Sequence, residues 1–251
     1  MTGRLWPESL APATRDLWER LSKDRNLGGF FLVGGTALAL RIRHRTSEDL
    51  DFAGVSGTLN RARIDRALAL LKSHGIDVQN VPDMASEQDF LDSGLELSDY
   101  QRNYLIGGVK TTFFAADPEM VSILREGGET PGLVPEVPAL PVLFALKAIA
   151  CAHRSKSRDW FDVYVLMKDH GVRLEYMRSV FRKHDPYNWD VAVLRLTSMT
   201  VSPADEGYAH LLQDPPTIET MRRFFTEERA RLEALEAALR VSGKGPDSPG
   251  E

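Results

Sequence analysis

Residues 30–52 read FFLVGGTALALRIRHRTSEDLDF, and this stretch decides the fold of the first half of the chain. Its apolar start, residues 30–33, predicts a strand, and Gly34 with Gly35 predicts a tight turn. The Ala- and Leu-rich segment that follows is typical of a short helix, and the stretch closes on a second strand, residues 49–52. Strand, glycine turn, helix and strand in this order predict one compact α/β unit.

Two carboxylates lie on the second strand of this unit. Asp49 and Asp51 are two positions apart, so their side chains are expected on one face, roughly 7 Å apart, because a strand rises ~3.3 Å per residue. Leu50 and Phe52 then face a core. Carboxylate oxygens are ligands that Mg²⁺ prefers, and such ions suit phosphoryl transfer. We therefore predict a metal site at Asp49 and Asp51.

The glycine pair predicts the phosphate half of the same site. Gly34 and Gly35 let backbone N–H groups approach an anion, and Thr36 is expected to cap the helix whose positive dipole end points to the same place. Each piece alone is better explained as a plain tight turn or a polar strand edge. The two pieces joined by a helix favour a phosphate cradle that faces a metal site.

Composition sets broad limits. The 251 residues are 43% hydrophobic and 27% charged, as in an ordinary globular protein of one large or two small domains. No apolar run approaches the ~20 residues of a membrane span, and residues 1–12 lack the apolar core of a signal peptide, so we expect a cytoplasmic location. The net charge of −5 argues against a surface that coats nucleic acid broadly, but it allows a local basic groove.

Cys151 is the single cysteine of the sequence. An intrachain disulfide and a cysteine-rich zinc site are therefore excluded. Because Cys151 lies in an apolar helical pattern, we expect it in the core rather than acting as a nucleophile.

The rest of the first half continues the α/β pattern. Helices are predicted over 11–24 and 61–74, the second capped by Asn60. A short strand is predicted over 76–81, and two antiparallel strands within 95–116 turn at Gly107 and Gly108. The first half is thus expected to be α/β with a mixed sheet.

The chain changes character near residue 130. A Gly/Pro-rich connector there is followed by predicted helices over 140–153, 158–170, 174–183, 190–198 and 218–241. We predict an α/β domain over 1–130, a helical domain over 131–241 and a disordered tail over 242–251.

A second group of charged residues lies in the helical half. Lys147 and Arg154 are seven apart and share one helix face, and Asp159 and Asp162 are three apart and share another. A lysine in an apolar helix needs a partner. A bound triphosphate and a neighbouring aspartate both satisfy this need, so a nucleotide site and a structural ion pair both stay open.

These motifs together, from residue 32 to 167, resemble those of the nucleotidyltransferase toxins of the abortive-infection AbiEii/AbiGii type, within the DNA polymerase β superfamily. The motifs are Gly-Gly-Thr, the Asp-x-Asp strand, the later helical lysine and Arg-Asp-x-x-Asp. The resemblance implies a polymerase-β-like nucleotidyltransferase domain with a mixed sheet, followed by a mainly helical domain. It also implies that an NTP and Mg²⁺ or Mn²⁺ are held in the cleft between them.

The resemblance implies roles for individual residues. Gly34, Gly35 and Thr36 would hold the triphosphate, and Asp49 and Asp51 would bind the metal. Lys147 would contact phosphate, Asp159, with Asp162, would complete the site, and Arg154 and Arg158 would add contacts to the nucleotide. His44 and Arg45 precede the aspartates closely enough to reach phosphate or acceptor, although a solvated loop fits them equally well.

One position departs from the wider superfamily, in which many members carry a third metal-binding carboxylate on a later strand. The corresponding strand here offers Lys110 and Thr112, and Asp117 lies beyond its expected end. Either Asp159 takes over the acidic role or the metal site is weak.

The resemblance points to RNA, with the 3′ end of tRNA as the acceptor, and to the toxin of a toxin–antitoxin or abortive-infection system with a separate antitoxin protein. A local groove for RNA could be formed by Arg41, Arg43, His44, Arg45, Arg154, Lys156 and Arg158. Two alternatives remain: nucleotidylation of a small molecule or a protein hydroxyl, and a nucleotide-binding module without turnover.

Overall fold

The computed structural model describes residues 4–126 and 134–241. The chain divides into two compact units, Met1–Leu146 and Lys147–Glu251, which are described separately. The predicted domain boundary between residues 130 and 131 lies outside the described residues, and so does the predicted tail over 242–251.

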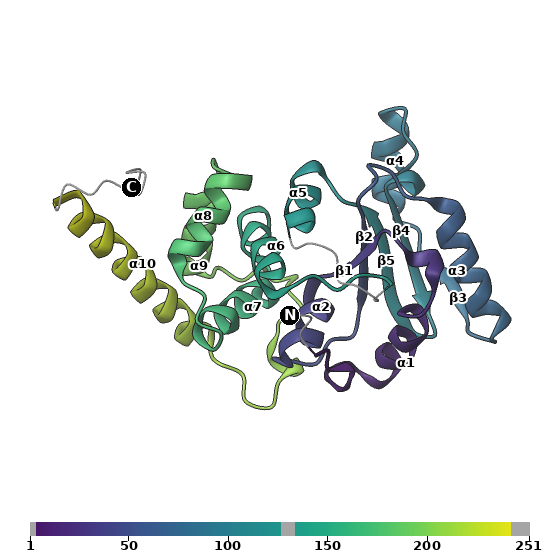
Figure 1. The fold of residues 1–251 in the computed structure, drawn as a ribbon, viewed down its shortest axis with the longest axis horizontal. Coiled ribbons are helices and arrows are strands. Elements are labelled where there is room, and N and C mark those ends of the chain that lie inside the picture. The colour runs from purple at the N-terminus through teal and green to yellow at the C-terminus, as the bar shows by residue number, and fades with distance from the viewer. Residues whose placement is uncertain (1–3, 127–133, 242–251) are drawn as a thin grey trace. The chain divides into compact units, whose positions relative to one another are not determined.

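The first unit is built on a mixed sheet of five strands (Figure 1). In spatial order the strands are β1 (Phe30–Val33), β2 (Leu50–Gly54), β5 (Val109–Ala115), β4 (Gln101–Ile106) and β3 (Val78–Asn80). Neighbouring strands are antiparallel except for β2 and β5, which run parallel. The predicted mixed sheet and the hairpin at Gly107 and Gly108 are confirmed.

The register of β2 fixes which residues flank Asp51. Asp51 lies opposite Val33 on β1 and opposite Thr112 on β5. Phe52, one position along, is fully buried and stacks on Phe113 with ring centroids 5.1 Å apart. Leu50 and Phe52 therefore face the core, as predicted, and the strand presents alternate residues to its other face.

Five α-helices accompany the described strands of the first unit. They are α1 (Pro12–Leu21), α2 (Gly34–Ile42), α3 (Arg61–Ser73), α4 (Met84–Asp92) and α5 (Pro118–Glu126). Asn60 caps α3, as predicted, by accepting from the backbone N–H of Arg63 at 3.2 Å. The helices α4 and α5 were not predicted from the sequence; α4 buries none of its residues, so it lacks the apolar face that marks an amphipathic helix.

The second unit is helical in its described part, which confirms the predicted helical C-terminal region. Its helices are α6 (Leu140–His153, which begins in the first unit), α7 (Ser157–Lys168), α8 (Leu174–His184), α9 (Trp189–Ser198) and α10 (Ile218–Val241). The short 3₁₀ turns among residues 4–126 and 134–241 are Pro7–Ser9, Arg25–Leu27, Leu97–Asp99 and Ala209–Leu211. Trp160, Phe181 and Phe225 are its largest buried side chains.

The last helix, α10, is attached to α8 by charged side chains. Arg231 donates to Glu175 at 2.7 Å and to Glu228 at 3.0 Å. These two hydrogen bonds raise the pKa of Arg231, so the guanidinium stays charged at any physiological pH.

Over residues 4–126 and 134–241, no helix combines the length and the apolar composition needed to cross a membrane.

Candidate active site

The glycine turn lies directly against a carboxylate. Gly34 follows β1 with a φ of +73°, a conformation that glycine adopts at little cost. A Cβ at this position would lie 2.9 Å from Oδ2 of Asp51. The absence of a side chain at residue 34 is therefore what lets the turn and the carboxylate share this place.

Asp49 is held by its backbone. It lies immediately before β2, and its carbonyl oxygen accepts a hydrogen bond from the hydroxyl of Thr36. The Thr36 hydroxyl lies 2.7 Å from Oγ of Ser47, and both residues are buried. Asp49 and Asp51 are half-buried while Leu50 between them is fully buried, which is the alternation expected of two carboxylates on one face.

Thr36 does not cap α2, so this prediction was wrong. The helix begins at Gly34 with Val33 as its N-cap, and no side chain caps it. The hydroxyl of Thr36 is instead used by Asp49 and Ser47, on the segment that leads into β2. Ser47 could not be selected from the sequence, because a single serine in a polar loop carries no pattern.

Arg45 is buried rather than solvated. The side chain is 8% exposed, and its Nη1 donates to the carbonyl of Thr46 at 3.2 Å. A Cβ on Gly35 would lie 2.0 Å from Nη2 of Arg45, so the guanidinium rests on the first turn of α2. The structure thus brings a cation to the glycine turn, whereas His44 beside it is half-buried.

The position opposite Asp51 on β5 carries no carboxylate. Thr112 occupies it, and Lys110 two positions earlier is exposed. Asp117 lies after β5 and accepts from the backbone N–H of Met120 at 2.7 Å, in the first turn of α5. The sheet of the first unit therefore offers Asp49 and Asp51 but no third acidic neighbour on β5, as the sequence predicted.

Asp49 and Asp51 suit a divalent cation by their chemistry. Carboxylate oxygens are hard donors, both side chains are half-buried, and Gly34 leaves room for the carboxylate of Asp51. Magnesium typically takes one or two protein carboxylates and completes its shell with water and substrate phosphate. The two residues therefore fit Mg²⁺ or Mn²⁺ together with a phosphate ligand.

The second unit contains a buried ion network. Nζ of Lys147 lies 2.7 Å from Oδ1 of Asp159 and 2.8 Å from Oδ2 of Asp162. Arg154 donates from Nε to Oδ2 of Asp159 at 2.7 Å. Lys147, Asp159 and Asp162 are 7%, 2% and 0% exposed. The four residues singled out in the sequence are thus brought together, and they satisfy one another as a structural ion pair would.

The charges of this network hold Asp159 ionised. Burial on its own raises the pKa of the Asp159 carboxyl, but Lys147 and Arg154 outweigh burial and leave the pKa below its ordinary value. Cys151, on the same helix as Lys147, is fully buried, and its burial raises the pKa of the thiol well above the usual range. Cys151 is therefore a core residue, as predicted, and not a thiolate nucleophile.

The other predicted cations make contacts of their own. Arg158 donates to the carbonyl of Gly207 at 2.8 Å and pairs with Glu206 at 3.1 Å, so it fixes the segment before Ala209–Leu211. Arg41 donates to the carbonyls of Val137 and Pro138. Arg43 and Lys156 are exposed, and the guanidinium carbon of Arg43 lies 4.7 Å from the ring centroid of Trp6.

With the fold and these contacts established, comparison with known proteins identifies the class. The model of the family "Nucleotidyl transferase AbiEii toxin, Type IV TA system" matches residues 15–242, which is most of the chain. The chain belongs to this family of nucleotidyl transferase toxins of type IV toxin–antitoxin systems.

Two known proteins are similar to this chain. The chain is 28% identical over 169 residues to a protein of Aquifex aeolicus (strain VF5) described as uncharacterized protein aq_aa25, covering 66% of this chain and 72% of that protein. The crystal structure of JHP933 from Helicobacter pylori is 17% identical, with a TM-score of 0.45, and covers 91% of this chain and 95% of that chain.

Proposed function

We propose that this chain transfers a nucleoside monophosphate from an NTP to an acceptor hydroxyl and releases pyrophosphate, with Mg²⁺ or Mn²⁺ held by Asp49 and Asp51. The observation that carries the proposal is the direct contact between the glycine turn and the Asp51 carboxylate, which leaves no space for a side chain at residue 34. A phosphate ligand at the turn would adjoin the carboxylates that hold the metal.

The residues of the first unit supply positioning and charge. The free N–H groups of the first turn of α2 favour an anion, and the buried guanidinium of Arg45 adds positive charge at the same turn. The hydroxyl of Thr36 fixes the backbone at Asp49. A bound divalent ion would activate the acceptor hydroxyl and neutralise charge on the phosphate oxygens. Nucleotidyl transfer depends mainly on the positioning of the reactants and on the stabilisation of charge.

In the second unit, we propose that the charge of Lys147 contacts phosphate and that Asp159 supplies the acidic group that Thr112 does not. The support is that Lys147 and Arg154 hold the carboxylate of Asp159 ionised, with Nζ of Lys147 2.7 Å and Nε of Arg154 2.7 Å from its oxygens. Arg154, through its hydrogen bond to Asp159, would orient that carboxylate.

For the acceptor we propose RNA, with the 3′ end of tRNA as the specific site, and for regulation a separate antitoxin protein. The exposed cations Arg43 and Lys156 support contact with a polyanion. The family's membership in toxin–antitoxin systems supports an antitoxin.

The assay that tests the acceptor combines the protein, Mg²⁺, each of four labelled NTPs and total RNA. Label should appear on RNA with the wild-type chain and should be lost with Asp49→Ala. Label on the protein or on a small molecule would show the alternative acceptors. Retained NTP binding without any transfer would show a nucleotide-binding module and would overturn the proposed reaction.

Comparing Gly34→Ala with Gly75→Ala distinguishes the effect of backbone strain from the effect of the close contact between residue 34 and Asp51. Gly34 and Gly75 have nearly equal φ values, +73° and +76°, but a Cβ on Gly75 meets nothing within 4 Å. Both alanine variants should lose about 1 kcal/mol of unfolding free energy, the typical cost of a left-handed residue. Only Gly34→Ala should also lose transfer, by about a hundredfold, because it displaces the carboxylate.

Chemical denaturation and a transfer assay with both variants provide the measurement. Equal activity of Gly34→Ala and Gly75→Ala would contradict the role of the turn in the active site.

A further inference from the structure

Helix α7 begins without a local side-chain cap. Lys156 occupies the N-cap position and its ammonium accepts no hydrogen bond, and Ser157 is the first residue of the helix. The first backbone N–H groups of a helix have no partner within it, so they need an acceptor from elsewhere. Asp159, the third residue of α7, carries a carboxylate of the buried ion network. Whatever holds this end of α7 therefore also bears on the network.

The acceptor is Asp205, 48 positions further along the chain. Its Oδ2 accepts from the backbone N–H of Ser157 at 2.7 Å, and its Oδ1 accepts from the Ser157 hydroxyl at 2.8 Å. Oδ1 also accepts from the backbone N–H of Gly207 at 2.6 Å. Burial on its own raises the pKa of the Asp205 carboxyl, but these hydrogen bonds and the charge of Arg158 outweigh burial and leave the pKa below its ordinary value. The carboxylate is therefore charged at neutral pH, as the positive end of a helix dipole favours.

The residues beside Asp205 strengthen this contact. Arg158 donates from Nε to the carbonyl of Gly207 at 2.8 Å and pairs with Glu206 at 3.1 Å. Further along α7, Phe161 stacks on Tyr208, with ring centroids 5.2 Å apart and ring planes at 8°. Residues 205–208 thus hold the start of α7 by hydrogen bonds, an ion pair and a ring contact.

Asp159 lies two residues beyond the anchored Ser157. Its backbone N–H donates to the carbonyl of Lys156 at 3.0 Å, within the same first turn. Its carboxylate meets Nζ of Lys147 and Nε of Arg154, each at 2.7 Å. Lys147 belongs to α6 and Arg154 follows the end of that helix, so both distances depend on where the first turn of α7 is held.

We propose that Asp205 is a positioning residue of the transferase. By holding Ser157, its carboxylate fixes the first turn of α7 and sets the place of the Asp159 carboxylate between Lys147 and Arg154. Asp205 acts through the helix and takes no part in the chemistry. Its effect on transfer rests on the role proposed above for Asp159, whereas its effect on the ion network does not.

The test follows the ammonium protons of Lys147 by NMR, on the full chain with isotope-labelled lysine. Lys147 is the only buried lysine among residues 4–126 and 134–241, so its ammonium protons should exchange with water more slowly than those of the other lysines there. Asp205→Asn keeps the shape of the side chain but loses the charge that holds Ser157. This variant should speed the exchange about tenfold, the size of effect expected for a lost helix cap, and should slow transfer by about as much.

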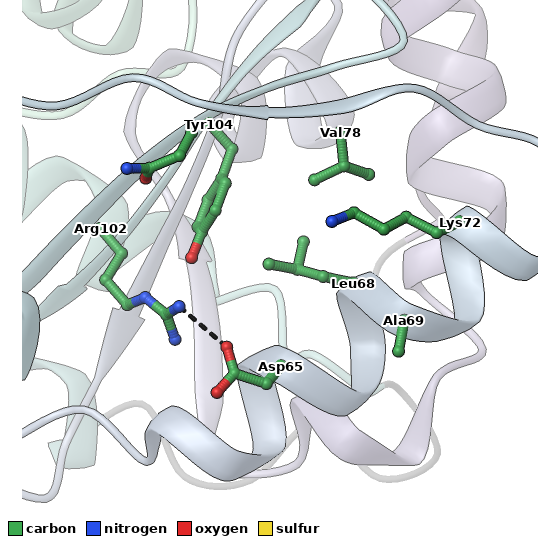
Figure 2. A pocket seen from close by; sticks show the side chains of 8 residues that line it. Asp65, Leu68, Ala69, Lys72, Val78, Arg102 and Tyr104 are labelled. Carbon is green, nitrogen blue, oxygen red and sulfur yellow. Dashed lines mark ion pairs between the residues drawn. The ribbon is translucent and has the colours of Figure 1, made fainter.

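The matched control is Asp65→Asn in the first unit. Asp65 lies on α3 beside a pocket, where its Oδ1 is 2.8 Å from Nη2 of Arg102 (Figure 2). This control also removes a carboxylate that contacts an arginine, and it should leave both the exchange and the transfer rate as in the wild type.

A rescue variant tests whether Asp205 acts through the start of α7. Lys156→Ser added to Asp205→Asn supplies a local N-cap, which should restore slow exchange of the Lys147 protons. Exchange is the readout here, because Lys156 is one of the cations proposed to contact RNA. If Asp205→Asn does not fold, Ser157→Ala replaces it; this variant removes only the hydroxyl donor to Asp205 and should speed the exchange about threefold.

Wild-type exchange in Asp205→Asn, or a local cap that restores nothing, would overturn the proposal and leave the proposed function untouched. Faster exchange with an unchanged transfer rate would instead show that the ion network does not serve the reaction. That result would overturn the role proposed for Asp159 and, with it, the effect of Asp205 on transfer.

Discussion

Replacing Asp51 with asparagine is expected to reduce nucleotidyl transfer about a thousandfold while the chain stays folded. A metal ion contributes several kcal/mol of charge stabilisation, and each ~1.4 kcal/mol corresponds to tenfold in rate. The amide retains the shape of the carboxylate, so it still fits against Gly34, but it carries no charge to hold a divalent cation. Initial rates with saturating NTP and Mg²⁺, measured beside thermal melting, provide the check.

Glu48→Gln is the matched control for Asp51→Asn. Glu48 lies on the same loop, its side chain is exposed, and its contact with Thr14 uses the backbone carbonyl at 2.6 Å. The amide should therefore leave transfer within about twofold of the wild type, as is usual for surface changes of less than ~0.5 kcal/mol. A fully active Asp51→Asn variant would exclude Asp51 as a metal ligand and would remove the main support of the proposed reaction.

Lys147→Met is expected to have the second large effect, a loss of stability. The methionine keeps the volume of the side chain but leaves Asp159 and Asp162 buried without their shared cation, at 2% and 0% exposure. Breaking a buried ion pair from one side typically costs about 3–5 kcal/mol. For a chain of this size, about 2–4 °C is lost per kcal/mol, so the melting temperature should fall by about 10 °C.

Two comparison variants show whether the fall in melting temperature comes from the unpaired aspartates. Lys156→Met removes an exposed cation from the segment between α6 and α7 and should change the melting temperature very little. The combination of Lys147→Met with Asp159→Asn and Asp162→Asn should recover part of the lost stability, since it removes the stranded charges together.

Transfer activity distinguishes the two roles of Lys147 that the sequence left open, a contact with nucleotide phosphate and a structural ion pair. If Lys147→Met is as stable as the wild type but inactive, the lysine serves phosphate rather than the fold. If the triple variant is both stable and active, the network is purely structural, and the proposed role of Asp159 is wrong.

The sequence predicted the local parts of this fold well. The strand FFLV, the Asn60 cap and the paired glycines at 107 and 108 each specify structure over a few neighbouring residues, and all three are found, whereas Gly34 and Gly35 form the first turn of α2 and not a separate turn before it. The parallel pairing of β2 with β5 was not predicted. It joins residues far apart in the chain, so no pattern within either strand could reveal it.

The candidate site was predictable where glycine and carboxylate patterns are distinctive. Gly34 and Asp51 could be selected because few other residues tolerate that turn or that chemistry. Arg45 was a candidate, but its burial could not be predicted, since an arginine in a polar loop usually lies in solvent; the burial follows from the space above Gly35. Thr36 was assigned a helix cap because that is the common use of threonine before a helix, whereas here a partner 13 positions away competes for the hydroxyl.

The pairing of β2 with β5 also sets the order in which the strands around Asp51 are completed during synthesis. Asp51 and its neighbour Thr112 are 61 positions apart (112 − 51), so β2 has only β1 beside it until the ribosome has made residues 109–115. A nascent chain that stops before β5 leaves the other edge of β2 unpaired, because β1 covers only one of its two edges. We therefore expect an interrupted translation product that ends before residue 109 to aggregate through this strand edge rather than to fold.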